Sequence, residues 1–340
     1  MRPTTKDLAK AAGVSLATVD RVLNERPNVS QKTVLKVNEA IRKIGFVRNL
    51  AAVNLARSKE YRFRFLLPLA GDQYITELLN QVEEANETLR SDMTAVQVRQ
   101  IQMDDPHLVA NYLASLGPEE VDGIAIMAPE SPQVRDSMSR LYERGIKVVQ
   151  FLSGQGNRNN LDFVGVDNFA AGATAGRILG RFLNGVTGKI MVIAETMQSL
   201  DSIQRRLGFD NILNTKFPNL SALPSLETHG DQQRTKRIVA RTFHHQEDIV
   251  AVYVMSSEAR IPVSHVADCH DLAKLAVIVH ERTPFTEAAI RDEQIDAIIA
   301  QNPGHAVRSA VRIMRARSDH RSPLASQEKI RIEILLKENL

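Results

Sequence analysis

The sequence predicts an all-α helix-turn-helix head, followed by an α/β body with two lobes that are each built on a parallel sheet. Three observations indicate this fold class. The first sixty residues carry short amphipathic helix patterns that are joined by polar turns. The rest alternates apolar runs with helix-like segments, which is typical of parallel sheets covered on both faces. About ten such runs in roughly 275 residues fit two lobes better than one.

The head begins with two short helices on either side of a Gly-Val-Ser turn. Their apolar residues are spaced as the inner faces of two helices packed across that turn: Leu8, Ala9, Ala12, Val14, Val19, Val22 and Leu23. Thr4 and Asp7 form an N-cap signal for the first helix, and Ser15 caps the second. Gly13 supplies the backbone freedom that the turn needs.

A third helix is expected at Gln31–Ile44, with Ser30 as its N-cap and Gly45 as its end. Residues 50–57 favour a helix that is too short to be stable alone. We therefore assign residues 1–48 to a helix-turn-helix domain and residues 49–60 to a hinge helix and linker.

The body, residues 61–340, continues with alternating elements. Strands are expected at Phe65–Leu69, Ala95–Ile101, Gly123–Ala128, Lys147–Leu152, Phe163–Val166, Lys189–Ala194, Ile249–Val254, Ala276–Val279, Ala297–Ala300 and Ile330–Leu336. Helices are expected at Ile75–Ser91, His107–Leu116, Gln133–Arg144, Phe169–Asn184, Ile203–Lys216, Gln233–Phe243 and Phe285–Arg291. Lobe one would take about 61–160 and 303–320, and lobe two about 161–302 and 328–340. The charged stretch Arg315–Lys329 is interpreted as a connector that returns between the lobes.

Composition favours a protein that stays inside the cell and does not enter a membrane. Hydrophobic residues make up 43% and charged residues 24% of the chain, as in ordinary globular proteins. No apolar run approaches the ~20 residues of a membrane span, and the first ten residues lack an apolar secretory segment. The single cysteine, Cys269, fits a reducing cytoplasm.

Charge is divided unevenly along the chain. Residues 1–64 hold 14 Lys and Arg against five Asp and Glu, a surplus of nine positive charges. The remaining residues hold 29 basic against 35 acidic side chains. A basic head on an acidic body is typical of a module that binds a polyanion, because phosphate neutralisation supplies much of nucleic-acid affinity. The alternative, a merely solvated face, is weaker because the surplus lies on a helical unit.

No residue pattern supports catalysis, a metal or a cofactor. His265, Cys269, His270 and His280 match no zinc spacing and are interpreted as ordinary loop and core residues. No nucleophile elbow or phosphate-binding glycine loop is present in the sequence. We expect a protein that is not an enzyme.

Motifs throughout the chain resemble a known family. Val14–Asn24, Val29–Thr33 and Asn49–Leu55 resemble the head of the lactose-repressor (LacI/GalR) family. Phe163–Asn168, Arg205–Phe209 and Ile295–Pro303 resemble its effector domain, which is similar to type I periplasmic sugar-binding proteins. The resemblance covers nearly the whole chain and is most specific in the head.

This resemblance implies a DNA-binding role for the head. The second helix would lie in the major groove with Leu16, Ala17 and Arg21 towards base edges, where Arg21 could pair bidentately with guanine. The expected DNA-binding residues are Thr4, Ser15, Leu16, Ala17, Thr18, Arg21, Asn24, Ser30, Thr33, Asn49, Ala52 and Leu55. Several of these also fit simple capping and turn-making. Leu55 would act as an apolar wedge in the minor groove, although a plain linker helix is the alternative.

Two positions depart from the family pattern. Asp20 stands where a small hydroxyl residue is usual, which places an anion close to DNA. Val47-Arg48-Asn49 replaces a more usual Pro-Asn before the hinge helix.

In the body, the resemblance implies a ligand between the lobes at the carboxyl ends of the strands. The expected ligand-binding residues are Asp72, Tyr74, Ser153, Arg205, Ser256 (or Ser257), Glu281 and Gln301. Arg205 would bind a ligand hydroxyl or carboxylate, and Glu281 would accept from vicinal hydroxyls. A surface salt bridge is the alternative for this pair, and core packing is the alternative for Tyr74.

The function implied is a homodimeric transcriptional regulator in the cytoplasm. It would bind a near-palindromic operator and respond to a small polar effector, a sugar, polyol or derivative. Repression of carbohydrate or polyol catabolism genes is the expected role, with induction or corepression both open. A solute-binding protein of a sugar transport system is the alternative.

Overall fold

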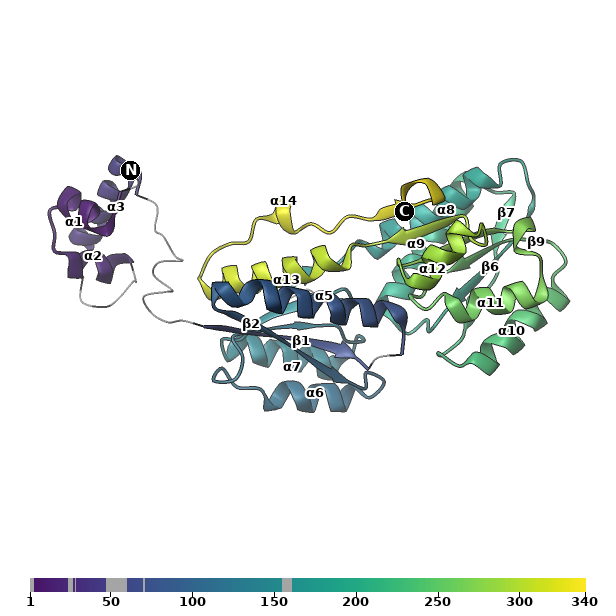
Figure 1. Cartoon of the computed structure of the whole chain (residues 1–340), viewed down its shortest axis with the longest axis horizontal. Helices are drawn as coiled ribbons and strands as arrows, with labels where there is room; N and C mark the ends of the chain where they lie inside the picture. Colours follow the sequence, from purple (N-terminus) through teal and green to yellow (C-terminus); the bar gives the residue numbers. More distant parts are fainter. Residues whose placement is uncertain (1–2, 24–26, 28, 47–59, 70, 155–160) are drawn as a thin grey trace. The chain divides into compact units, whose positions relative to one another are not determined.

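The computed structural model describes residues 3–23, 27, 29–46, 60–69, 71–154 and 161–340, and Figure 1 shows them in a cartoon of the whole chain. The chain forms two compact units, one within residues 1–59 and the other over residues 60–340. No helix in the described part of the chain has the length and apolar character that crossing a bilayer requires.

The first unit contains α1 (Thr5–Ala12), α2 (Leu16–Leu23) and α3 (Gln31–Ile44). Leu8, Val19 and Val37 are buried at their centre, and the other expected inner-face residues pack around them. The capping predictions are confirmed: Thr4 and Asp7 form a capping box, and Gly13 adopts φ +64 at the end of α1. Ser30 accepts from the Thr33 amide at the start of α3.

The second unit contains two sheets, as the alternating pattern predicts. In its first lobe the elements are β1 (Tyr61–Pro68), α5 (Gln73–Leu89), η1 (Arg90–Asp92), β2 (Thr94–Ile101), α6 (Pro106–Ser115), β3 (Gly123–Ile126), α7 (Pro132–Glu143), β4 (Lys147–Phe151) and β5 (Asp162–Val164). The strands form a parallel sheet of order β2-β1-β3-β4-β5. Helix α5 covers one face of this sheet, and α6 and α7 cover the other (Figure 1).

The second lobe continues with α8 (Asn168–Phe182), β6 (Gly188–Ala194), α9 (Leu200–Lys216), β7 (Leu220–Ala222), β8 (Leu226–Glu227), α10 (Gln232–His245), β9 (Ile249–Val254), α11 (Arg260–Cys269), η2 (Leu272–Lys274), β10 (Ala276–His280), α12 (Pro284–Arg291) and β11 (Ala297–Ala300). Its sheet has the order β12-β11-β10-β9-β6-β7, with β8 paired to β6. Helices α8 and α9 cover one face, and α10, α11 and α12 cover the other.

After β11 the chain crosses back to the first lobe as α13 (Pro303–Ser318), which packs beside α5 (Figure 1). It then passes α14 (Ala325–Glu328) and ends in β12 (Glu333–Leu335) and η3 (Lys337–Asn339). Strand β12 pairs antiparallel to β11, so the second sheet is mixed at this edge. Antiparallel edge strands on otherwise parallel sheets are common.

Several sequence predictions need correction. Residues 303–318 form one helix, so the expected connector Arg315–Lys329 begins inside α13 and not in a loop. Helix α11 occupies a segment interpreted as loop and core, and it contains both His265 and Cys269. Strand β5 belongs to the first sheet, which extends lobe one a few residues beyond the expected limit of 160. The final strand is shorter than expected, and the short strands β7 and β8 were not expected.

Candidate functional site

Helix α2 carries the candidate DNA-reading face of the head. Leu16, Ala17, Asp20 and Arg21 are exposed, and their spacing places them on one side of the helix. Leu16 is 46% exposed although its side chain is apolar. Because Val19, on the opposite side, is fully buried against α1 and α3, the core fixes which side of α2 faces solvent.

The polar residues expected near phosphates hold the helix starts. The Ser15 hydroxyl oxygen accepts from the Thr18 amide at 3.1 Å and lies 2.8 Å from the Thr18 hydroxyl. Ser30 and Thr33 repeat this arrangement at α3, with 2.8 Å between their hydroxyls. Each pair leaves exposed hydroxyls at a helix N-terminus, where an anion is favoured.

Four residues of the DNA-binding prediction lie outside the described residues: Asn24, Asn49, Ala52 and Leu55. The same holds for the departure at Val47–Asn49.

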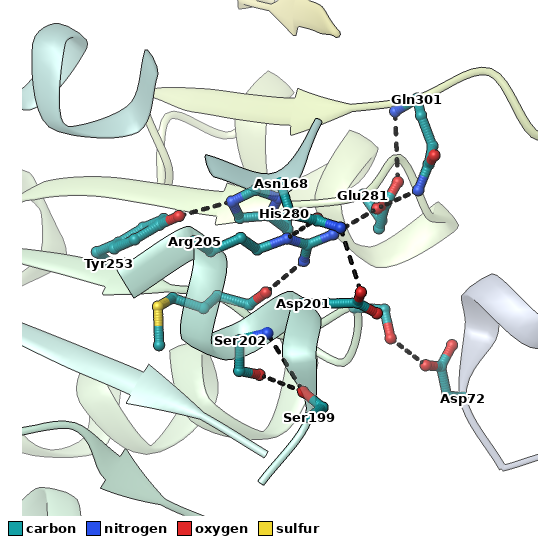
Figure 2. Close-up of polar contacts among 12 residues, drawn as sticks. Asp72, Asn168, Ser199, Asp201, Ser202, Arg205, Tyr253, His280, Glu281 and Gln301 are labelled. Atoms are coloured by element: carbon teal, nitrogen blue, oxygen red, sulfur yellow. Dashed lines mark hydrogen bonds and ion pairs between the residues drawn. The ribbon is translucent and has the colours of Figure 1, made fainter. Parts of the chain in front are cut away.

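In the body, Arg205 of α9 is the centre of a buried polar cluster (Figure 2). Its Nε donates to Asn168 Oδ1 at 2.8 Å, and its Nη1 donates to the Met255 carbonyl oxygen at 2.6 Å. Its Nη2 lies 3.5 Å from Glu281 Oε1. Asn168 in turn donates from Nδ2 to Asp201 Oδ1 at 3.2 Å. The guanidinium is therefore held by hydrogen bonds on several sides. Arg205 as a whole is only 8% exposed.

Glu281 follows β10 and is held in an uncommon backbone conformation, with φ +65. Its amide donates to the Ile299 carbonyl oxygen at 3.0 Å, and its carbonyl oxygen accepts from the Thr286 hydroxyl at 3.0 Å. The side chain accepts from Gln301 Nε2 at 3.1 Å. Left-handed backbone costs a non-glycine residue on the order of 1–2 kcal/mol and is found often at binding sites.

Asp72 and Tyr74, at the start of α5, bring the first lobe to this cluster. Asp72 Oδ1 caps α5 by accepting from the Tyr74 and Ile75 amides. Its Oδ2 accepts from the Ser257 hydroxyl of the second lobe at 2.5 Å. The Tyr74 hydroxyl and Gln301 Oε1 are buried and have no hydrogen-bond partner among the described residues. Buried polar atoms of this kind usually have partners, so both are candidates to meet a ligand.

Burial governs the ionisation of the cluster. Desolvation raises the pKa of Glu281 to about 6, although the charge of Arg205 and the Gln301 hydrogen bonds act in the opposite direction. Desolvation also raises the pKa of Asp201 to about 6, again against the charge of Arg205. Burial raises the pKa of Tyr74 well above its usual range, and the Glu281 charge adds to this. Beneath the cluster, burial lowers the pKa of His280, whose Nε2 lies 2.8 Å from the Tyr253 hydroxyl.

The structure thus brings Asp72, Tyr74, Arg205, Glu281 and Gln301 together near the carboxyl ends of the strands. Figure 2 shows Asp72, Arg205, Glu281 and Gln301 of this set. The other two expected residues bond elsewhere. The Ser153 hydroxyl donates to the Ala128 carbonyl oxygen at 3.0 Å, and the Ser256 hydroxyl donates to the Glu258 carbonyl oxygen at 3.4 Å. Of the serine pair, Ser257 makes the contact with Asp72.

Sequence reasoning did not select Asn168 and Asp201 as site residues. Asn168 ends the motif Phe163–Asn168, so its place between a strand and a helix was a usable signal. Asp201 was placed before the expected helix Ile203–Lys216, but α9 begins at Leu200 and includes it. No group of three or more His, Cys, Asp or Glu within the described residues is arranged to hold a metal ion.

The two sheets, the crossings between them and the polar cluster at their strand ends define a two-lobed α/β body, preceded by a helix-turn-helix head. Comparison with known proteins agrees with this class. Residues 63–322 match the periplasmic binding protein domain family, and residues 4–49 match the bacterial regulatory proteins of the lacI family. The chain belongs to the periplasmic binding protein domain family and carries a lacI-family head.

Curated relatives are named as transcriptional regulators. The chain is 32% identical over 144 residues to the HTH-type transcriptional regulator DegA of Bacillus subtilis, which is 42% of this chain and 41% of DegA. It is 28% identical over 210 residues to the sucrose operon repressor of Streptococcus mutans, 61% of this chain and 60% of the repressor. The matches thus span less than two thirds of the length of these relatives.

Solved structures share the fold of the body. An ABC transporter solute binding protein from Burkholderia graminis, in complex with D-arabinose, superposes with a TM-score of 0.72 at 21% identity. This match covers 83% of the present chain and 96% of the binding protein. At that identity the likeness concerns the fold alone.

Proposed function

We propose that the protein is a DNA-binding transcriptional regulator that responds to a small polar effector. The observation that carries the proposal is the occurrence, in one chain, of an exposed face of α2 that carries Arg21 and of a buried polar cluster at the strand ends of the body. The lacI-family match of the head and the regulator relatives support it.

For DNA binding, Arg21 is the proposed reader of a base edge, with Leu16 and Ala17 beside it. A guanidinium can donate two hydrogen bonds to guanine, and apolar side chains suit the thymine methyl group. The hydroxyls of Ser15, Ser30 and neighbouring residues would contact phosphates, which position the head without reading sequence. Asn49, Ala52 and Leu55 remain part of this proposal as hinge contacts, with Leu55 in the minor groove.

For the effector, the acceptors and donors around Arg205 suit a hydroxyl-rich ligand, so a sugar, polyol or derivative is proposed. Binding between the lobes would favour one lobe arrangement and thereby change operator affinity, through a coupling free energy of about 1–3 kcal/mol. We propose repression of carbohydrate or polyol catabolism genes by a homodimer on a near-palindromic operator, because two half-sites match two heads. Such a protein acts in the cytoplasm, where the DNA is, and as a regulator and not as an enzyme.

The alternative function is a solute-binding protein of a sugar transport system. The likeness of the body to the arabinose-bound protein favours it. It leaves the basic helix-turn-helix head without a role, however, and the regulator proposal accounts for both units.

A footprint of the full-length protein on the DNA upstream of its own gene tests the proposal. We expect protection of a near-palindromic site and a change in that protection with an effector found by screening sugars and polyols. Arg21→Ala should weaken specific binding by about 1–3 kcal/mol, because a bidentate base contact is lost. The matched control is Lys43→Ala, an exposed cation of α3, which should weaken specific and non-specific binding alike. If no site is protected under any of these conditions, the regulator proposal is wrong.

A further inference from the structure

We infer that the effector is a hydroxyl-rich compound that also carries a protonated amine, such as an amino sugar or amino polyol. Glu195 and Asp72 would accept hydrogen bonds from its ammonium group. This inference rests on the regulator function proposed above, because it concerns the same ligand site.

Four carboxylates from neighbouring loops converge on the site. Asp72 follows β1, Glu195 follows β6, Glu258 follows β9 and Glu281 follows β10, and each loop lies at a strand's carboxyl end. They are close enough to influence one another: desolvation raises the pKa of Glu195, and the charges of Asp72 and Glu258 raise it further. The charge of Asp72 likewise raises the pKa of Glu281. Like charges gathered in this way favour a cation between them.

The protein's own cations pair with Glu281 and Glu258 and leave Asp72 and Glu195 without an ion pair among the described residues. Arg205 is shared between Glu281 and the Asn168 and Met255 oxygens, and Arg260 lies 3.8 Å from Glu258. His229 lowers the pKa of Glu195, but by less than the charges of Asp72 and Glu258 raise it. The Glu195 side chain is exposed, and its carboxylate has no hydrogen bond or ion pair from a described side chain or amide.

A second observation points to a ligand at the same place. Tyr74 and Gln301 are 2% and 4% exposed, and the Tyr74 hydroxyl and Gln301 Oε1 lack partners among the described residues. The Tyr74 amide donates to Asp72 Oδ1, and Gln301 Nε2 donates to Glu281 Oε1, so both residues contact this carboxylate group. An amide oxygen and carboxylates accept hydrogen bonds, so the site needs donors. An ammonium group supplies three donors with a positive charge, and hydroxyls supply the rest.

A metal ion is the other cation that carboxylates could hold. The described residues contain no group of three or more His, Cys, Asp or Glu arranged for one. The carboxylates instead belong to four separate loops. Charge-assisted hydrogen bonds to an amine are about twice as strong as neutral ones, so the amine should dominate affinity.

Calorimetry of the full-length protein with matched compounds tests this inference. Each set contains a 2-amino-2-deoxyhexose or 1-amino-1-deoxyalditol, its hydroxyl parent and its N-acetyl derivative. We expect an amine to bind at least about tenfold more tightly than its parent and its N-acetyl derivative. Glu195→Gln should reduce the preference for the amine over its parent by about tenfold. Glu247→Gln is the matched control, because Glu247 is exposed before β9, at the opposite end of that strand, and should keep the wild-type preference.

The outcomes separate this inference from the function on which it rests. A parent that binds as tightly as its amine, or a Glu195→Gln variant with the wild-type preference, overturns the inference and leaves a neutral sugar or polyol as effector. Binding of no compound in any set also overturns it. In both cases the DNA footprint of the unliganded protein still tests independently whether the protein is a regulator.

Discussion

At the scale of single residues, Arg205 determines the electrostatics of the buried polar cluster in the body. One guanidinium lies near two buried or half-buried carboxyls, Glu281 at 3.5 Å and Asp201 through Asn168. A single positive charge only partly compensates two desolvated carboxylates, so both have raised pKa values of about 6. Removing Arg205 would leave both carboxyls without compensation, so we expect Arg205 to contribute to the stability of the fold as well as to the proposed ligand binding.

Asp201 gives this imbalance a measurable consequence. Its folded-state pKa of about 6 lies above the ordinary 3.8, so the folded chain binds this proton more tightly than the unfolded chain. Ionised Asp201 therefore costs stability at neutral pH, and the cost disappears as the pH falls from about 6 to about 4. Asp201→Asn, which retains an acceptor for Asn168, should stabilise the fold at pH 7 by about 1–2 kcal/mol.

The stability gained by Asp201→Asn should vanish near pH 4. Denaturant unfolding of the variant and the wild type across this pH range measures it. Glu143→Gln, at an exposed position at the end of α7, is the control and should stay within about 0.5 kcal/mol of wild type. An Asp201→Asn variant less stable than wild type at pH 7 would contradict the assignment.

At the scale of elements, the close approach of α8 and α9 positions Arg205. A Cβ built on Gly172 of α8 would lie 1.9 Å from the Arg205 carbonyl oxygen, and one on Gly208 of α9 would lie 2.0 Å from the Phe169 carbonyl oxygen. Only glycine permits such contact, because the opposing atoms belong to backbone and cannot rotate away. The two helices thus set where the guanidinium lies.

Gly172→Ala should push α9 from α8, with a cost of about 1–3 kcal/mol and a loss of effector affinity. The control is Gly304→Ala in α13, where the new Cβ would meet the ends of the Gln81 and Arg308 side chains, which can move. This second variant should be neutral or more stable by up to about 1 kcal/mol, because alanine favours helix. Thermal unfolding and effector titration of both variants measure the difference. If the two variants have the same stability and effector affinity, the α8–α9 contact at Gly172 does not position Arg205.

The sequence predicts most of the helices and strands of this fold but few of the contacts between them. The helices of the head follow from caps and periodic apolar residues, and α3 begins and ends at the residues expected from Ser30 and Gly45. Helix α13 was missed because residues 303–318 are rich in arginine, although buried Ala306, Val307 and Ala310 pack on the first sheet. Residue contacts across loops, such as Asn168 with Arg205, depend on tertiary packing, so only motif resemblance could have indicated them.

At the scale of the whole two-lobed unit, a few polar contacts between described residues join the two lobes beyond the chain crossings. The Ser257 hydroxyl donates to Asp72 Oδ2, and the Phe285 amide donates to Gln73 Oε1 at 3.0 Å. Each such bond contributes only about 0.5–1.5 kcal/mol net. The balance between lobe arrangements is therefore easily shifted, and a regulator that senses a ligand by lobe movement requires such a balance.

Ser257→Ala removes one of these bonds and should populate more open arrangements by about two- to tenfold. Spin labels on the exposed native Cys269 of α11 and on Glu87→Cys of α5 report the distance between the lobes. We expect a broader and longer distance distribution in Ser257→Ala. Ser256→Ala is the matched control, because its hydroxyl bonds to the Glu258 carbonyl oxygen of its own loop and should leave the distances unchanged. Identical distributions in both variants and wild type would mean that the Asp72–Ser257 bond does not hold the lobes, and that the chain crossings alone set their arrangement.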